Sequence, residues 1–449
     1  HRQVGYNGGH SWQEPYYSRF NMRAWYQWPA TGMESFTGNF QTPDFSHLKK
    51  RAEETFSRTH HTAAYVIQDF GEETGFYYHW SNNPFGRTWL QDKDIPEGAH
   101  RLFQLYLREK YGRIDRLNTE WETKYRDFSE VKLRTENGYP AGWLFGKPPA
   151  KVPDNIAPLL DTHGFFFWYT RQVAETLTSR LKELNPVSDW SMSFSLTFNL
   201  FSPVPMTMVH PVYHASVLAP WHDKALARSK NGSTPFFSFH WGFDEDERVW
   251  GQFWNHSLAA LATFMSNWGS QFNCDLTHSR STLLLKRLLA RVRPREQFFL
   301  SCYPVADFDV GIYHPDLDWQ TVHSRPNFYL RASGSQATTM GQLGFKPVGT
   351  GWLGGPEFQV YNALNSSGYV ARFITEEEIP RCRAIVVPYV ETMPETAAAR
   401  LRDFVAAGGL LVTMPVLATH NGYGRPYPVC PGGGLNEVIG VTLEPAIIG

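Results

Sequence analysis

The sequence lacks several features that would assign it to a function class at once. Its four cysteines, Cys274, Cys302, Cys382 and Cys430, lie far apart and form no CxxC or Cys/His cluster, so neither a zinc site nor a disulfide-dense scaffold is indicated. No run of eighteen or more apolar residues occurs, so no membrane span is predicted. Internal repeats and low-complexity tracts are also missing, and a hydrophobic content of 42% indicates a globular protein.

Excess charge of either sign is missing too. Lys and Arg (42) nearly balance Asp and Glu (43), and no basic run or acidic tail stands out, so nucleic acid is not an expected partner. The glycine-rich stretch "GTGWLGG" (349–355) neither follows a strand nor opens a helix, as a phosphate-binding loop must. The sequence therefore predicts no cofactor.

Aromatic residues, in contrast, are abundant. The chain of 449 residues contains 16 Trp, 21 Tyr and 32 Phe, more than a core of this size requires. We expect most of these rings to fill the core and some to line a surface, where flat aromatic faces suit the apolar faces of sugar rings.

The first part of the chain alternates between helix and strand patterns. Expected strands include "AAYVIQDF" (63–70), "DWSMSFSL" (189–196), "HASVLAPW" (214–221), "TPFFSFHWGF" (234–243) and "SQFNCDLT" (270–277), with at most one strand in residues 1–45. Expected helices cover residues 42–61, 98–125, 165–186, 253–269 and 281–294. Repeated units of this length predict a parallel sheet and, from their number, a (β/α)8 barrel over residues 1–296.

The pattern changes after Pro294. The runs "FDVGIYHP", "YVARFIT" and "CRAIVVPYV", the helical "ETAAARLRDFVAAGG" and the expected buried strand "LLVTMPV" indicate an open, doubly wound α/β domain over residues 297–449. The chain starts at His1 and ends in "VTLEPAIIG" without a terminal element, so we expect a segment of a longer protein. The sequence assigns no cellular compartment.

Two adjacent carboxylates, Glu72 and Glu73, directly follow the strand "AAYVIQDF". Barrel strands deliver catalytic side chains from their carboxyl ends, so this position predicts acid/base chemistry. Adjacent residues on an extended segment point to opposite sides, so only one of the two faces the barrel axis.

The blocks "YVIQDFGEETG" and "LREKYGRIDRLNTEWETKYRDFSEV" resemble the family 42 glycoside hydrolases, a β-galactosidase family in which an Asn-Glu or Asp-Glu pair ends the fourth barrel strand. "CRAIVVPYVETM", "LRDFVAAGGLLVTMP" and "PGGGLNEVIGV" are similar to that family's amidotransferase-like (flavodoxin-like) trimerisation domain. The resemblance implies a β-galactoside or related glycan as substrate, a homotrimer, and barrel strands one and two upstream of His1 or in a separate piece. It also implies Glu73 as the general acid/base, with Glu72 in place of the usual Asn or Asp.

The nucleophile is where the sequence departs from the family. The resemblance implies a Glu at the end of the seventh strand, but "TPFFSFHWGF" has His240 there, with Asp244 and Glu245 a few residues later. Either Asp244 or Glu245 reaches in, or the reaction is inverting, or catalysis is lost. Carboxyl groups about 5–5.5 Å apart would indicate a retaining mechanism and about 6.5–9.5 Å an inverting one.

Further candidate residues surround these carboxylates. Tyr77, Trp80, Asn39, His240 and Trp241 are expected to contact substrate. The acidic loop after His240 fits no standard metal-ligand spacing, so no metal is predicted. Neither Cys382 nor Cys430 lies on a nucleophile elbow, so glutaminase activity is not expected.

Three readings of function stay open at this point. The first is a glycoside hydrolase with Glu73 as acid/base. The second is a catalytically inactive relative that serves as a structural or carbohydrate-binding assembly subunit, and the third is a barrel acting on a non-sugar substrate. A second carboxylate opposite Glu73 would separate the first reading from the second.

Overall fold

The computed structural model describes residues 8–10, 23–27, 49–50, 53, 65–69, 95, 97–134, 154–184, 189–194, 206–209, 223, 236–241, 264–268, 275, 277–295, 297–298, 308–315 and 356–443. The chain forms two compact units. One contains residues 1–77, 82–84 and 170–305, and the other contains residues 78–81, 85–169 and 306–449. Residues 85–169 thus group with the C-terminal part, whereas the boundary at 296/297 stays a prediction.

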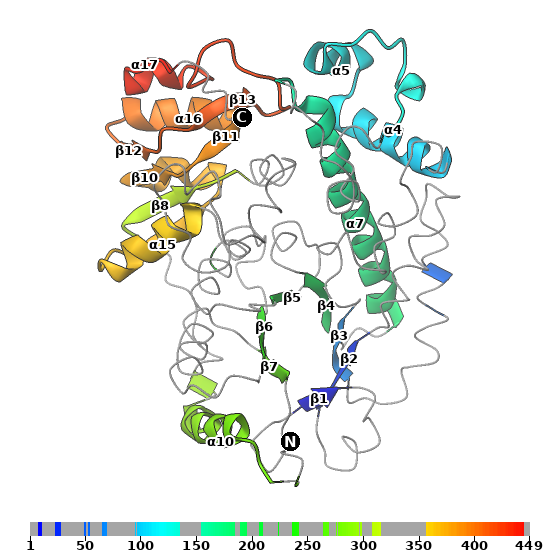
Figure 1. The fold of residues 1–449 in the computed structure, drawn as a ribbon, viewed down its shortest axis with the longest axis vertical. Helices are drawn as coiled ribbons and strands as arrows, with labels where there is room; N and C mark the ends of the chain where they lie inside the picture. The colour runs from blue at the N-terminus through cyan, green and yellow to red at the C-terminus, as the bar shows by residue number, and fades with distance from the viewer. Residues whose placement is uncertain are drawn as a thin grey trace. The chain divides into compact units, whose positions relative to one another are not determined.

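The first unit is built on a seven-stranded sheet (Figure 1). Its strands follow one another in chain order and every neighbouring pair is parallel. They are β1 (Gly8–His10), β2 (Arg23–Gln27), β3 (Tyr65–Asp69), β4 (Asp189–Phe194), β5 (Met206–Val209), β6 (Phe236–Trp241) and β7 (Phe264–Trp268). All seven carboxyl ends therefore lie at one edge of the sheet.

Strands β3, β4 and β6 confirm the expected strands over 63–70, 189–196 and 234–243. Two strands, β1 and β2, precede β3, where the sequence predicts at most one. The "GGH" of β1 has no intrinsic β-preference and is a strand because it pairs with β2. The expected strand at 214–221 lies outside the described residues.

The expected helix over 253–269 is wrong in its second half, because residues 264–268 form β7. This stretch follows a helix-like apolar pattern, but it pairs in register with β6, from Phe237 with Phe264 to Trp241 with Trp268. Pairing within the sheet has overridden the local preference. The expected strand at 270–277 is not found at Asp275 or Thr277, the members of that stretch that are described.

The helices mostly begin and end where local signals place them. The region 98–125 is two helices, α4 (Glu97–Tyr111) and α5 (Ile114–Trp121), because Gly112 takes a φ of 71° and ends the first. Helix α7 (Ala157–Leu184) begins eight residues before the predicted start, where the Asn155 side chain accepts a 3.0 Å hydrogen bond from the Ala157 amide. Helix α10 (Arg280–Val292) is capped by Ser279.

The C-terminal sheet has four parallel strands in the order β12-β10-β8-β9. These are β8 (Val310–Tyr313), β9 (Ala371–Ile374), β10 (Ala384–Val387) and β12 (Leu410–Thr413). The strand that comes first in the chain lies inside the sheet, as in doubly wound folds. A separate parallel pair is formed by β11 (Val390–Met393) and β13 (Leu417–Asn421).

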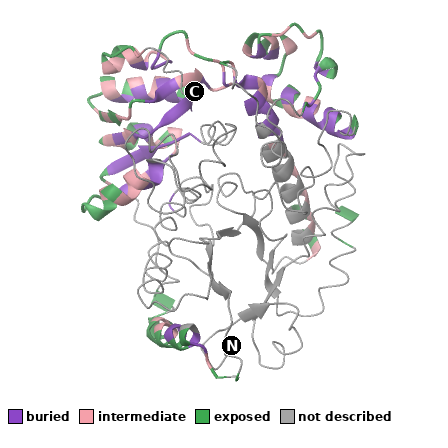
Figure 2. Cartoon of the chain, in the orientation of Figure 1, coloured by how far each residue is buried: buried purple, intermediate pink, exposed green. Residues whose placement is uncertain are grey.

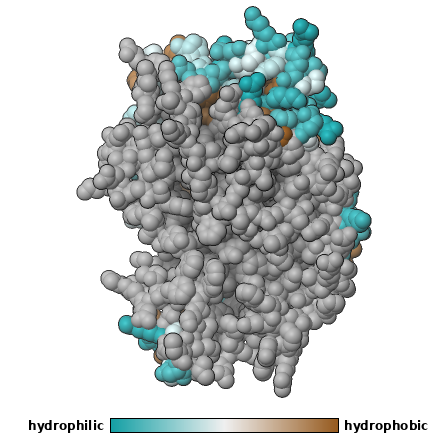
Figure 3. Space-filling view, turned by 45° about the vertical axis from the view of Figure 1, so that its right-hand side comes forward, coloured by the Kyte–Doolittle hydropathy of each residue, from teal (hydrophilic) through white to brown (hydrophobic). Residues whose placement is uncertain are grey.

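One sheet face packs against α16 (Glu395–Ala406) and α17 (Leu435–Ile439). Strand and helix residues together form the core of this region, and Figure 2 draws buried residues in purple. Helix α15 (Pro356–Ser366) stacks Tyr361 on Phe373 of β9. The prediction that β12 is buried is wrong, because Leu410 and Val412 are 60% and 47% exposed. Where described residues come to the surface in the view of Figure 3, they are mainly hydrophilic.

Candidate functional site

The predicted catalytic residues follow two strands of the seven-stranded sheet. Strand β3 ends at Asp69, before Glu72 and Glu73, and strand β6 ends at Trp241, before Asp244 and Glu245. Because the sheet is parallel throughout, both segments leave from the same edge of the sheet.

Most of the predicted site residues lie outside the described part of the chain. These are Asn39, Glu72, Glu73, Tyr77, Trp80, Asp244 and Glu245. For His240 and Trp241 the backbone in β6 is described. The distance between Glu73 and a second carboxylate, and hence the choice between retaining and inverting chemistry, stays a prediction.

Pairing between β6 and β7 adds a polar residue that sequence reasoning missed. His240 pairs with Asn267, and Trp241 pairs with Trp268. Paired residues of a parallel sheet share a face, so a polar pair and an aromatic pair occupy opposite faces at the carboxyl end. Asn267 was missed because residues 253–269 were expected to form a helix, which hides the alternation of polar and apolar positions along β7.

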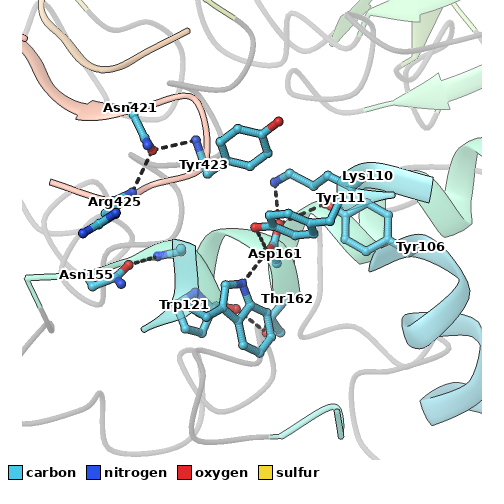
Figure 4. Close-up of polar contacts among 12 residues, drawn as sticks. Tyr106, Lys110, Tyr111, Trp121, Asn155, Asp161, Thr162, Asn421, Tyr423 and Arg425 are labelled. Atoms are coloured by element: carbon cyan, nitrogen blue, oxygen red, sulfur yellow. Dashed lines mark hydrogen bonds and ion pairs between the residues drawn. The ribbon is translucent and has the colours of Figure 1, made fainter. Parts of the chain in front are cut away.

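The second unit contains a network of buried polar groups centred on Asp161 of α7, whose side chain is fully buried (Figure 4). One carboxylate oxygen accepts from Lys110 Nζ and, at 3.5 Å, from the Tyr106 hydroxyl. The other accepts from the Tyr111 hydroxyl at 2.6 Å and from Trp121 Nε1 at 2.7 Å. Four donors fill the acceptor capacity of a carboxylate. We interpret Asp161 as a structural anchor because it has no lone pair left for a substrate.

The electrostatics of the network agree with this interpretation. Burial raises the pKa of Tyr111 well above its usual value, and the negative charge of Asp161 raises it further. The pKa of Tyr106 is raised by the same causes in the same order. Both phenols therefore stay protonated at neutral pH and remain hydrogen-bond donors to Asp161.

The loop after β13 packs on this network. The Tyr423 ring lies 5.2 Å from the Tyr111 ring, 5.5 Å from Lys110 Nζ and 4.7 Å from the Arg116 guanidinium carbon. Two cations thus contact one aromatic ring. Burial raises the pKa of Tyr423, so this ring too is a neutral phenol at neutral pH.

Hydrogen bonds fix the same loop to the helices. Asn421 donates to the Glu120 carboxylate at 3.0 Å, and the Ile156 amide donates to the Gly424 carbonyl at 3.1 Å. The helices of residues 97–169 and the end of β13 with its following loop are therefore joined by packed, specific contacts.

The cysteines described by the structure are poor candidates for a nucleophile. Cys382 precedes β10, and burial, together with the nearby Glu378 carboxylate, raises its thiol pKa to about 11. Burial also raises the thiol pKa of Cys430. A nucleophilic cysteine needs a lowered pKa, and both thiols are shifted in the opposite direction.

The described residues contain neither a candidate metal site nor a candidate membrane span. No group of three or more His, Cys, Asp or Glu there is placed to hold a metal ion. No helix in the same part of the chain is both long and apolar enough to cross a membrane.

Comparison with known proteins agrees with the resemblance seen in the sequence. Residues 358–447 match the family described as the β-galactosidase trimerisation domain. No curated protein matches the chain by sequence. The match confirms that the C-terminal region resembles the trimerisation domain of family 42.

Solved β-galactosidases share the fold over most of the chain. The cold-adapted β-galactosidase from Rahnella sp. R3 matches with a TM-score of 0.65 at 15% identity, over 96% of this chain and 67% of that one. The enzyme from Bacillus circulans sp. alkalophilus matches with a TM-score of 0.66 at 14% identity, over 95% of this chain and 66% of that one. The enzyme from Marinomonas ef1 matches with a TM-score of 0.63 at 12% identity, over 98% of this chain and 76% of that one. The chain spans about two thirds to three quarters of these proteins, and at such identities the likeness shows the fold.

Proposed function

We propose that this protein is a glycoside hydrolase that acts on β-galactosides or related glycans by general acid/base catalysis. The observation that carries the proposal is the position of two acidic segments, 72–73 and 244–245, after the carboxyl ends of β3 and β6 in one all-parallel sheet. The shared fold with β-galactosidases supports the same reaction class.

Strand spacing supports the assignment of these segments. In family 42, which this chain resembles, the acid/base follows the fourth strand and the nucleophile follows the seventh, so the two strands are three positions apart in the barrel. Strands β3 and β6 are also three positions apart. Three steps of about 4.8 Å would span about 14 Å in a flat sheet, too far for either mechanism. We therefore also propose that the sheet closes into a (β/α)8 barrel, which needs one strand beyond the seven described.

In this proposal Glu73 protonates the leaving oxygen, and Asp244 or Glu245 acts as nucleophile or as base for water. Glu72 is a close like charge that raises the pKa of one member of the pair, which suits an acid working near neutral pH. Asn39, Tyr77 and Trp80 contact the sugar, together with whichever of His240 and Trp241 faces the barrel axis, because β6 places these two on opposite faces.

Hydrolysis of aryl β-galactosides by the purified protein tests the proposal. Glu73→Gln should lower kcat/KM by about 10²–10⁴-fold on a substrate with a poor leaving group, and far less on one whose leaving group needs no proton. The exposed Glu437→Gln serves as a matched control and should leave both rates unchanged. Equal rates for Glu73→Gln and wild type on the poor leaving group would contradict the assignment.

One observation favours a second candidate function, a catalytically inactive carbohydrate-binding subunit. His240 lies at the carboxyl end of β6, where the resemblance places the nucleophilic Glu. An imidazole is a poor substitute for that carboxylate. Binding of galactosides by calorimetry, with no hydrolysis in long incubations and no effect of Asp244→Asn or Glu245→Gln on binding, would support this candidate over the enzyme.

The match to a trimerisation domain supports a homo-oligomer, and we propose a homotrimer. Sedimentation equilibrium should give about three times the chain mass of 51.5 kDa. A mass equal to one chain at micromolar concentration would contradict this part of the proposal.

A further inference from the structure

Within the described part of the chain, one face of the four-stranded sheet is covered along only half of its width. Paired residues in a parallel sheet share a face, so Phe373, Ile312, Val386 and Val412 form one row across β9, β8, β10 and β12. Phe373 is 2% exposed and Ile312 is fully buried, Val386 is half-buried, and Val412 is 47% exposed. The residues on β9 and β8 are therefore buried, and burial falls from β8 through β10 to β12.

The neighbouring row on the same face shows the same trend. It consists of Ala371, Val310, Ala384 and Leu410 on the same four strands. Ala371 is 1% and Val310 9% exposed, Ala384 is half-buried, and Leu410 is 60% exposed. In both rows the residues on β9 and β8 are buried, whereas those on β10 and β12 are half-buried or exposed.

Helix α15 accounts for the covered half. Its Tyr361 ring stacks on Phe373 of β9 at 5.6 Å, and its Phe358 ring meets the same side chain edge-on at 5.9 Å. On the opposite sheet face, Ile385 and Val387 are fully buried in the core that α16 completes. The exposure of β12 is therefore specific to one half of one face.

We propose that the uncovered half-face, here named the β10–β12 stripe (Ala384, Val386, Leu410 and Val412), is a surface on which a second copy of this chain docks. The inference rests on the proposed homo-oligomer and names the surface it uses. The stripe is wholly aliphatic and lies within residues 358–447, which match a trimerisation domain. Aliphatic side chains in a row on a sheet gain free energy when a partner removes them from water.

The symmetry of a trimer restricts what faces the stripe. A closed ring of three copies uses heterologous contacts, in which a surface of one copy meets a different surface of the next. Pairing of β12 with β12 of a second copy is isologous and gives a two-fold dimer instead. We therefore assign the stripe to a contact with a different part of the neighbouring copy.

The test compares the mass of the wild-type chain with that of Leu410→Lys/Val412→Lys. Lysines are common on natural edge strands and oppose association. Leu283→Lys on α10 is the matched control, since Leu283 is 47% exposed and lies outside the stripe. Wild type and control should sediment as the oligomer. The double variant should be monomeric at the same concentration, with a dissociation constant raised by roughly 30-fold or more.

The outcomes separate the two proposals. A monomeric wild type overturns the homo-oligomer and the stripe together, whereas an oligomeric wild type with an equally oligomeric double variant overturns the stripe alone. Assembly is measured without substrate, so the result is independent of hydrolysis. If circular dichroism shows that the double variant has lost its fold, Leu410→Asn decides, because so exposed a side chain can be replaced with little effect on the fold.

Discussion

At the scale of single residues, Asp161 is the best-defined polar group in the described part of the chain. Its carboxylate is fully buried and accepts from Lys110, Tyr111 and Trp121. Such a group is stable as a charge only while its partners are in place, because a buried charge without partners costs several kcal/mol.

Replacement of Asp161 by Asn should therefore lower the free energy of unfolding by about 3 kcal/mol. The substitution keeps the shape but removes the charge that Lys110 and the two phenols require. Urea unfolding followed by tryptophan fluorescence measures the change, with the exposed Asp403→Asn as control. A loss below about 1 kcal/mol would show that the network contributes little net stability.

Tyr111 predicts how stability depends on alkaline pH. It is 3% exposed and its pKa is raised in the folded protein, whereas the unfolded chain ionises it near pH 10. The stabilisation is complete below pH 10 and is lost as pH rises above 10, because only the unfolded state then releases the proton.

The free energy of unfolding should accordingly fall by about 1.4 kcal/mol per pH unit above pH 10 for this group alone. Tyr111→Phe should make the decline between pH 10 and 11 shallower by about 1 kcal/mol, because the unfolded phenol is only half ionised at pH 10. Urea titrations at both pH values measure the slope, and identical slopes for the variant and the wild type would refute the assignment.

At the scale of elements, the loop after β13 depends on one glycine. Gly424 has a φ of 89°, and a Cβ there would lie 3.1 Å from the backbone N and Cα of Ala157 at the start of α7. Gly408 has nearly the same backbone, with a φ of 92°, but a Cβ there meets nothing within 4 Å.

Comparing alanine substitutions at Gly408 and Gly424 separates the energetic cost of a left-handed backbone from the cost of a steric clash. Gly408→Ala should cost about 1 kcal/mol from the left-handed φ alone. Gly424→Ala should cost about 2–4 kcal/mol, because α7 must also shift. If both variants lose the same free energy of unfolding in thermal or urea unfolding, the loop can move away from α7 without an energetic cost.

The elements also show how far the sequence could predict the fold. Strands such as β3, β6 and β10 are short aliphatic or aromatic runs, and α10 and α16 have clear end signals, so local chemistry was sufficient. The prediction for β7 was wrong because "FMSNW" continues a helical apolar pattern, and these residues form a strand only through pairing with β6. The exposure of β12 depends on where α15 packs, which the sequence of β12 does not encode.

The candidate site was predictable to the same limited extent. Strand order alone places residues 72–73 and 244–245 at one sheet edge, because parallel strands share a direction. The anchor at Asp161 was not predicted, since its donors Lys110, Tyr111 and Trp121 are 40 to 51 residues away. A signal was present in "EKYGRIDRLNTEW", where Tyr111 and Trp121, two aromatic residues with a polar donor group, lie on the faces that the helices bury.

At the scale of the whole molecule, a homo-oligomer predicts that thermal stability depends on concentration. Association stabilises the folded state by mass action, so Tm should rise as protein concentration increases. Differential scanning calorimetry over a hundredfold concentration range measures the shift, and Leu410→Lys/Val412→Lys should remove it. A Tm independent of concentration in the wild type would argue for a monomer.

The second unit is discontinuous along the chain, with residues 85–169 and 306–449 separated by residues that belong to the first unit. Ribosomes add roughly 5–20 residues per second. The helices that hold Tyr111 and Arg116 therefore leave the ribosome some tens of seconds before Tyr423, which packs on both side chains. During that interval Tyr111 and Arg116 lack the ring that packs on them in the folded protein, so this unit can complete its packing only late in synthesis.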